Sequence, residues 1–254
     1  MGLIVILCLS ILASVNVVKS EQSIPTLFII GDSTVKNSDK GLQGWGDAIG
    51  EFFDSTRINI KNRARGGRSS RTFQTEGLWD QVLQELKPGD FVLLQFGHND
   101  GGPINDDSRA RGSLPGTSND IEEIDNKLTH KHEVVHTFGW YLKKFIADTK
   151  AKGATAIVLS PVPRNIWIDG KVERAKDSYG SWAASAAGSG KAFYIDLNEI
   201  VAVRYEQLGL QKVGKEFFLV DHTHTTPAGA RVNAESVVAG LKLLKNCSLT
   251  SFLH

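Results

Sequence analysis

The chain has 254 residues, of which 41% are hydrophobic and 22% charged, and its formal net charge is +1. These values are typical of an ordinary globular protein that is long enough for one α/β domain with a substantial core. A net charge this close to zero gives no overall field that favours nucleic acid or an anionic membrane, so we expect neither as a partner. We expect the protein to be a monomer.

The chain begins with an apolar segment. Residues 3–18 are almost wholly apolar, and the sequence becomes polar directly after them. This pattern resembles a secretory signal peptide with cleavage near Ser20, which predicts a secreted or periplasmic protein with one domain over residues 21–254. The segment is shorter than the roughly 20 residues of a membrane-spanning helix. Its removal would leave Cys247 as the only cysteine, and therefore no internal disulfide.

The first predicted strand leads to a candidate nucleophile. The apolar run Leu27–Ile30 stops abruptly at Gly31-Asp32-Ser33, which is typical of a buried strand in a parallel sheet. Active sites of open α/β sheets lie just beyond the carboxyl ends of strands, so Ser33 is a candidate nucleophile. The same three residues are also common in a strand-to-helix turn, where Asp or Ser caps the helix.

Predicted strands and helices alternate through the rest of the chain. We expect further strands at 58–62, 91–96, 154–160 and 192–195, and helices at 44–53, 75–86, 131–152, 172–187, 197–208 and 227–244. This alternation predicts an α/β fold, with a parallel sheet between two helix layers and right-handed crossovers. Residues 101–129 are polar and show no sustained periodicity, so we expect a functional loop over the strand ends.

Five polar or small residues follow predicted strands or precede the last helix: Ser33, Gly67, Asn99, Asp221 and His224. Acyl transfer by serine needs a neutral imidazole to accept the hydroxyl proton and an acid to orient that imidazole. We interpret Ser33 as the nucleophile, His224 as the base and Asp221 as the orienting acid. The developing oxyanion also needs hydrogen-bond donors. We assign these to the backbone N–H groups of Ser33 and Gly67 and the side-chain amide of Asn99, since glycine allows close approach of its backbone.

These residues lie in short blocks that match the SGNH (GDSL-type) hydrolases, named for Ser, Gly, Asn and His. The blocks occur in the same order and span essentially the whole predicted mature chain: Gly31-Asp32-Ser33, Gly67, Gly97-His98-Asn99-Asp100 and Asp221-His222-Thr223-His224. The resemblance implies a flavodoxin-like three-layer α/β/α sandwich with a five-stranded parallel sheet. It also implies esterase or lipase activity without a cofactor or metal.

Within that superfamily, the chain resembles the rhamnogalacturonan acetylesterase branch. The shared blocks are Gly-Asp-Ser-Thr, Gly-Gly-Arg-Ser-Ser-Arg and Asp-His-Thr-His-Thr-Thr-Pro-Ala-Gly-Ala. This implies removal of O-acetyl groups from pectic polysaccharide through an acyl-enzyme. Other acetylated sugars such as xylan, or small or lipid esters, are alternative substrates. Thr34 departs from the leucine in the superfamily's name but matches this branch, and we give His222 no catalytic role.

Basic residues gather around the Gly67 turn: Lys61, Arg63, Arg65, Arg68 and Arg71. Guanidinium groups bind carboxylates in bidentate fashion, and galacturonate supplies carboxylates. We therefore consider Arg68 and Arg71 as substrate contacts, and Trp167, on a predicted strand-end loop, as a residue that could stack on a sugar. The alternatives are salt bridges that shape the loop for the arginines, and core packing for Trp167.

A competing motif lies in the helix predicted at 131–152. His132-Glu133-Val134-Val135-His136 matches the His-Glu-x-x-His pattern of zinc proteases, which requires both histidines on one helical face. The longer metzincin pattern fails, because its third ligand position is Leu142, which cannot bind zinc. A zinc metallopeptidase is thus one alternative from a different class, and a non-catalytic carbohydrate-binding protein is another. The complete set of catalytic roles argues against the second.

Overall fold

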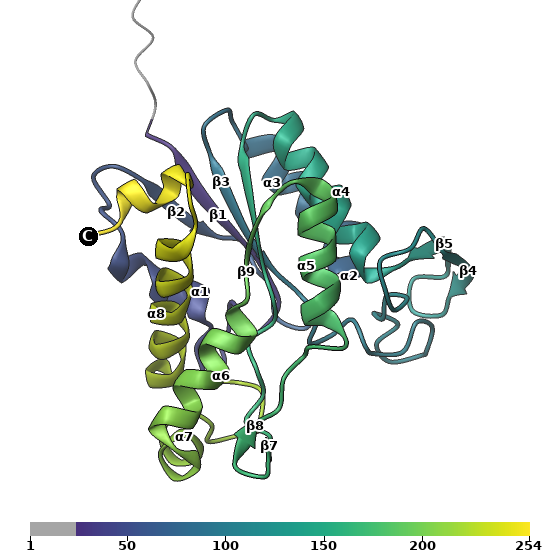
Figure 1. The fold of residues 1–254 in the computed structure, drawn as a ribbon. Helices are drawn as coiled ribbons and strands as arrows, with labels where there is room; N and C mark the ends of the chain where they lie inside the picture. Colours follow the sequence, from purple (N-terminus) through teal and green to yellow (C-terminus); the bar gives the residue numbers. More distant parts are fainter. Residues whose placement is uncertain (1–23) are drawn as a thin grey trace, which may run out of the picture.

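The computed structural model describes residues 24–254, and the predicted signal peptide at 1–20 lies outside them. In the described part, one parallel sheet has the strand order β2-β1-β3-β6-β9 (Figure 1). Its strands are β1 (Thr26–Gly31), β2 (Asn59–Asn62), β3 (Phe91–Gln95), β6 (Thr155–Leu159) and β9 (Phe193–Ile195). This is the flavodoxin-like order, and it confirms the predicted five-stranded parallel sheet.

Helices cover both faces of the sheet (Figure 1). Along β1, Leu27 and Ile29 pack into one hydrophobic cluster, whereas Phe28 and Ile30 pack into the other. The first cluster is closed by α1 (Trp45–Ala48), α6 (Leu197–Leu208), α7 (Leu210–Glu216) and α8 (Pro227–Leu243). The second is closed by α2 (Ser70–Thr75), α3 (Leu78–Glu85), α4 (Phe138–Ala151) and α5 (Tyr179–Gly190). Strand side chains point alternately to the two faces, so a strand buried on both sides must be apolar throughout.

The helix predicted at 131–152 is wrong in its first part. Residues there form β5 (Lys131–His136), which pairs antiparallel with β4 (Ile121–Asn126). Helix α4 begins only at Phe138, after Thr137, whose side chain accepts a hydrogen bond from the backbone N–H of Trp140. The apolar period of α4 does not extend back into β5, where Val135 is buried and Val134 is exposed as in a strand. The β4–β5 hairpin projects from the side of the sandwich (Figure 1).

Smaller differences concern the ends of elements. The helix predicted at 44–53 divides into α1 and a 3₁₀ turn (Ile49–Phe52), and α3 begins at Leu78 because Gly77 adopts the left-handed conformation with φ +71°. The helix predicted at 172–187 begins at Tyr179, after a short hairpin of β7 (Trp167–Ile168) and β8 (Lys171–Val172). Helices α2 and α7 were not predicted. None of the helices within residues 24–254 has both the length and the apolar character needed to cross a membrane.

Candidate active site

The turn after β1 is organised by Asp32 and presents Ser33. The Asp32 carboxylate is fully buried and accepts hydrogen bonds from the backbone N–H and the hydroxyl of Thr34, at 2.9 and 2.7 Å. The side-chain amide of Gln95 donates to the same hydroxyl at 2.7 Å, which ties the turn to the end of β3. Ser33 makes none of these contacts and is only partly buried. Its hydroxyl is therefore free to point into the space above the strand ends.

Ser33, His224 and Asp221 form one chain of hydrogen bonds. His224 Nε2 lies 2.8 Å from Ser33 Oγ, and His224 Nδ1 lies 2.7 Å from Asp221 Oδ2. With the carboxylate beside Nδ1, we assign the proton to Nδ1, which leaves Nε2 as the acceptor for the serine hydroxyl. The structure thus brings together the three residues that the sequence predicts as nucleophile, base and orienting acid.

The loop that carries His224 and Asp221 is held by the other carboxylate oxygen. Asp221 Oδ1 accepts the backbone N–H groups of Thr223 and His224, at 2.6 and 2.7 Å. Burial opposes ionisation of Asp221, but the hydrogen bonds from His224 and Thr223 outweigh it and lower the pKa to about 2. Asp221 is therefore ionised at any pH where an esterase would work. His222 is exposed and takes no part in this chain of bonds, and its carbonyl accepts the N–H of Asn165 at 2.7 Å.

The predicted oxyanion donors lie at the same hollow. Ser33, Gly67, Asn99 and His224 all line a depression of about 830 Å³ at the carboxyl ends of the strands. Gly67 has a φ of +77°, a conformation that side chains other than glycine rarely adopt. Asn99 is 7% exposed, and its amide donates to the Arg68 carbonyl at 2.9 Å. That bond fixes the amide and leaves its second N–H available to a ligand.

The basic residues around Gly67 are mostly neutralised. The prediction that Arg71 contacts substrate is wrong, because its side chain is fully buried. Its guanidinium donates to Glu133 at 2.7 and 2.8 Å and to the carbonyls of Ile104 and Gly112. Arg68 pairs with Glu76 at 2.9 Å. Lys61 and Arg63 likewise share the carboxylate of Glu85.

Trp167 is also not at the site. Its indole N–H donates to Asn165 Oδ1 at 2.7 Å, and its ring packs against the hydrophobic cluster beneath α6 and α8. It is absent from the lining of the hollow that contains Ser33. The alternative of core packing is therefore the better description of Trp167.

The structure instead adds arginines that sequence reasoning missed. Arg109 and Arg111 lie in the polar segment between β3 and β4, which is the first part of the loop predicted at 101–129, and they line the Ser33 hollow together with Arg65 and Lys36. None of the three arginines has a carboxylate partner within residues 24–254, and Arg111 donates to the Gly67 carbonyl at 2.9 Å. Their sequence signal was a short Arg-Ala-Arg segment in a loop, which does not reveal where the loop folds.

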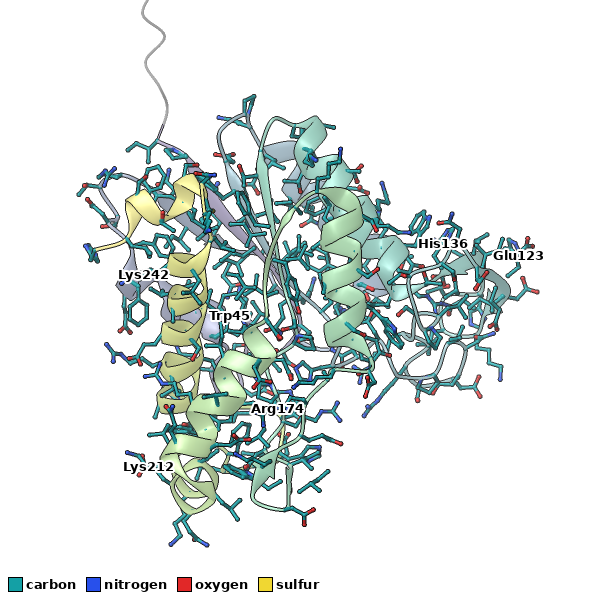
Figure 2. The ribbon with its side chains drawn as sticks, viewed as in Figure 1. Trp45, Glu123, His136, Arg174, Lys212 and Lys242 are labelled. Atoms are coloured by element: carbon teal, nitrogen blue, oxygen red, sulfur yellow. The ribbon has the colours of Figure 1, made fainter. Side chains whose placement is uncertain are left out.

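The His-Glu-x-x-His motif does not form a metal site. On β5, His132 and His136 share a face but lie about 13 Å apart along the strand, at ~3.3 Å per residue. His136 stacks on Trp140 with ring centroids 3.6 Å apart, and Glu133 pairs with Arg71. Figure 2 labels His136 and Glu123 on the projecting hairpin. Residues 24–254 hold no group of three or more His, Cys, Asp or Glu side chains that could share a metal ion.

Two buried titratable groups neighbour Asn99 in the chain. Burial raises the pKa of Asp100 to about 6, although hydrogen bonds from Ser70 and Ser113 favour its ionised form. Burial lowers the pKa of His98. Both side chains have a buried polar atom without a hydrogen-bond partner, Oδ2 of Asp100 and Nε2 of His98. Of the two, only His98 lines a hollow next to the site, and for both residues burial disfavours the charged form of the side chain.

The chain matches known esterases over most of its length. A model of the GDSL-like lipase/acylhydrolase family matches residues 29–232. The chain is 34% identical over 212 residues to a rhamnogalacturonan acetylesterase of Emericella nidulans, with 83% of this chain and 82% of that protein covered. It is 31% identical over 224 residues to the probable rhamnogalacturonan acetylesterase YesY of Bacillus subtilis, with 86% and 93% covered.

Solved structures share the same fold. The protein YxiM of Bacillus subtilis superposes with a TM-score of 0.70 at 26% identity, over 87% of this chain and 56% of the longer YxiM chain. An acetylxylan esterase from Geobacillus stearothermophilus superposes with a TM-score of 0.55, over 87% of this chain and 95% of its own, at 16% identity. At that identity, the second likeness concerns the fold alone.

Proposed function

This chain belongs to the GDSL-like lipase/acylhydrolase family and is a carboxylic ester hydrolase, and we propose that it removes O-acetyl groups from rhamnogalacturonan. The observation that carries the proposal is the continuous chain of hydrogen bonds from Ser33 through His224 to Asp221. The names of two relatives at 34% and 31% identity support the substrate.

In the proposed reaction, Ser33 Oγ attacks the acetyl carbonyl while His224 Nε2 takes its proton. Asp221 stabilises the resulting imidazolium. The backbone N–H groups of Ser33 and Gly67 and the amide of Asn99 donate to the oxyanion, and each such donor is typically worth ~2.7–4 kcal/mol of the barrier. The sugar leaves as an alcohol protonated by His224. Water, activated by the same histidine, then releases acetate from the acyl-enzyme.

The charge of the hollow supports an acidic polysaccharide. Asp39 supplies the single carboxylate in the lining of the hollow. The lining cations that have no carboxylate partner within residues 24–254 are more numerous: Lys36, Arg65, Arg109 and Arg111. Galacturonate units carry carboxylates that match these groups, whereas xylan has a neutral backbone. An acetylated uronate polymer is therefore a better fit to this surface than acetylated xylan or a lipid ester.

We also propose that the protein is exported. The support is the apolar segment at residues 3–18, which has the pattern of a signal peptide. Polysaccharides of plant cell walls lie outside the cells that degrade them, so export agrees with the proposed substrate. Amino-terminal sequencing of the mature protein from the culture medium tests the cleavage near Ser20.

The decisive variant is Ser33→Ala. Because the hydroxyl is the nucleophile, we expect kcat/KM for an aryl acetate to fall by at least about 10³-fold while the melting temperature stays the same. His222→Ala is the matched control, since the His222 side chain lies outside the bonded chain, and it should retain activity. If Ser33→Ala keeps most of the hydrolysis, the proposed mechanism is wrong.

The substrate is tested by measuring acetate release from acetylated rhamnogalacturonan, acetylated homogalacturonan and acetylated xylan at equal acetyl content. We expect the highest kcat/KM for rhamnogalacturonan. Faster release from xylan would contradict the proposed substrate and leave the esterase mechanism in place.

A further inference from the structure

A second hollow adjoins the one that contains Ser33. It encloses about 470 Å³, and Asn99 and Arg111 line both hollows. Its walls come from residues 97–102 after β3, residues 161–164 after β6, and residues 173–179 at the start of α5. Since Asn99 belongs to the proposed oxyanion site, a molecule in this hollow would lie next to the reacting ester.

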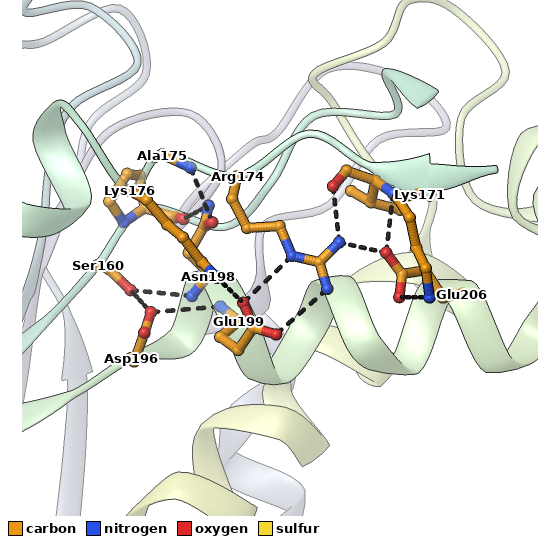
Figure 3. Close-up of polar contacts among 11 residues, drawn as sticks. Ser160, Lys171, Arg174, Ala175, Lys176, Asp196, Asn198, Glu199 and Glu206 are labelled. Carbon is orange, nitrogen blue, oxygen red and sulfur yellow. Dashed lines mark hydrogen bonds and ion pairs between the residues drawn. The ribbon is translucent and has the colours of Figure 1, made fainter. Parts of the chain in front are cut away.

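The outer wall of this hollow is held in place by polar contacts (Figure 3). Arg174 lies between Glu199 and Glu206 of α6 and also donates to the Val172 carbonyl at 2.6 Å. The side-chain amide of Asn198 is buried and links two wall segments. Its N–H donates to the Pro161 carbonyl at 2.8 Å, and its oxygen accepts the backbone N–H of Ala175 at 3.0 Å. Figure 2 labels Arg174 beside α6. The hollow is thus preformed, as ligand sites usually are.

Several side chains in the hollow have hydrogen-bond donors that are unused or only weakly bonded. Arg164 is exposed, has no carboxylate partner within residues 24–254, and makes only a 3.4 Å contact with the His98 carbonyl. Arg111 Nε is buried without a hydrogen-bond partner. Tyr179 is half-buried, with its ring packed edge-on against Phe138 at 5.0 Å. Such groups can donate to an anionic, hydroxyl-rich ligand.

The charges around these arginines are only partly balanced. Glu173 is the one carboxylate in the lining, and it is exposed and lacks an ion-pair partner within residues 24–254. Arg111 is also attracted electrostatically to the buried carboxylates of Asp32 and Asp100. Arg164 has no such partner, which makes it the cation most available to a ligand.

We propose that this second hollow is a subsite for a second uronate unit of the polysaccharide chain, near the acetylated unit and separated from it by a rhamnose in rhamnogalacturonan. Arg164 and Arg111 bind the carboxylate, and the Tyr179 hydroxyl bonds to the sugar. An acetyl group would not use this space, because a methyl needs neither two guanidinium groups nor a volume of about 470 Å³. The proposal rests on the proposed function, and it assigns a uronate chain, rather than a single sugar, as the preferred substrate.

The test compares a galacturonate–rhamnose–galacturonate trimer that is O-acetylated on one galacturonate with O-acetylated monogalacturonate. The measured quantity is the ratio of their kcat/KM values, because only the longer ester can place a second uronate in the adjacent hollow. We expect wild-type enzyme to prefer the trimer, and Arg164→Gln to reduce that preference at least tenfold through KM. Arg231→Gln, an exposed arginine on α8 whose partners are Glu51 and Glu235, is the matched control and should keep the wild-type ratio.

A second arm uses the trimer with its carboxylates converted to methyl esters. We expect wild-type enzyme to show no preference for this neutral trimer over the monogalacturonate ester, which would show that the subsite recognises the negative charge of the carboxylate. The subsite is overturned if Arg164→Gln keeps the wild-type ratio, or if the methyl-esterified trimer is still preferred. If the enzyme hydrolyses aryl acetates but neither the trimer nor the monogalacturonate ester, the proposed substrate and the subsite are both refuted, whereas the esterase mechanism stands.

Discussion

At the end of β1, neighbouring residues have opposite environments. Asp32 is fully buried and bonded to Thr34, whereas Ser33 is partly exposed and bonded to His224. The difference arises from the turn, which directs one side chain inward to satisfy backbone groups and the next outward above the strand ends. A carboxylate in the inward position shapes the turn and cannot reach a substrate.

The ionisation of Asp100 should affect the stability of the fold. Asp100 is fully buried, and its Oδ1 accepts bonds from the Ser70 N–H and hydroxyl and from the Ser113 hydroxyl. Burial, aided by the charge of Asp32, raises the pKa to about 6, above the ~3.9 of an unfolded aspartate. The folded state therefore binds the proton more tightly, so this contribution to stability is full below about pH 4 and is lost as pH rises to about 6.

We predict that Asp100→Asn removes this dependence on pH. Between pH 4 and pH 7 the unfolding free energy of the wild type should fall relative to that of the variant, by on the order of 3 kcal/mol. Urea denaturation at a series of pH values measures it. Asp177→Asn, at an exposed aspartate, controls for the loss of one carboxylate, and a difference that stays constant with pH would contradict the prediction.

At the scale of elements, the β4–β5 hairpin is attached to the sandwich by one buried ion pair. Arg71 of α2 donates to Glu133 of β5, and Asn126 of β4 donates to the same carboxylate at 2.7 Å. Arg71 also binds the carbonyls of Ile104 and Gly112, in the loop that carries the arginines of the active site. The Glu133 side chain therefore acts as a structural link between α2, the hairpin and that loop.

We predict that Glu133→Ala lowers the unfolding free energy by about 3–5 kcal/mol, because it leaves the Arg71 charge buried and unpaired. Glu51→Ala, which breaks an exposed pair with Arg231, is the control and should cost less than about 1 kcal/mol. Denaturant titration of both variants measures the difference. Equal effects of the two substitutions would show that the link is not structural.

The same contact predicts the result of metal removal. Since Glu133 binds Arg71 rather than activating a metal-bound water, a chelator should leave hydrolysis of an aryl acetate unchanged. Activity assays before and after dialysis against chelator check this. Loss of activity that zinc restores would favour the metallopeptidase alternative.

For the whole molecule, charge is balanced in total but not in space. The chain has 29 basic and 28 acidic residues. The lining of the Ser33 hollow nevertheless has the single carboxylate of Asp39 against four cations without a carboxylate partner in the described part of the chain: Lys36, Arg65, Arg109 and Arg111. A cleft with one sign of charge attracts oppositely charged substrates, and salt screens that attraction over about 10 Å at 0.1 M. Electrostatic attraction over distances of several ångströms should therefore contribute to the preference for negatively charged substrates.

We predict that kcat/KM for acetylated oligogalacturonate falls roughly three- to tenfold between low and moderate salt, because its carboxylates are attracted to the hollow. A neutral aryl acetate should change less than about twofold over the same range. Steady-state kinetics across a salt series measures both. Parallel salt profiles for the two esters would show that the local charge has no effect on encounter.

The sequence by itself determined the strands of the sheet and the order of Ser33, Gly67, Asn99, Asp221 and His224 at their ends. It could do so because buried strands such as β1, β3 and β6 need nearly continuous apolar runs, and because nucleophile, base and oxyanion donors are restricted to a few residue types. Helix α6 was predicted with the observed bounds, because the residues that begin and end it and its apolar spacing all lie within the helix or next to it in the sequence.

Only the tertiary structure decided which charges are free. Arg71 and Arg111 are both arginines in polar segments, but one is buried against Glu133 and the other lines both hollows. Likewise, residues 131–136 form a strand that pairs with the neighbouring β4 in a local hairpin. The ion pair between Glu133 and Arg71, 62 residues apart in the chain, holds that hairpin against α2. The charge of a side chain is local, but its partner depends on the fold, and partners decide whether a residue binds substrate or stabilises the protein.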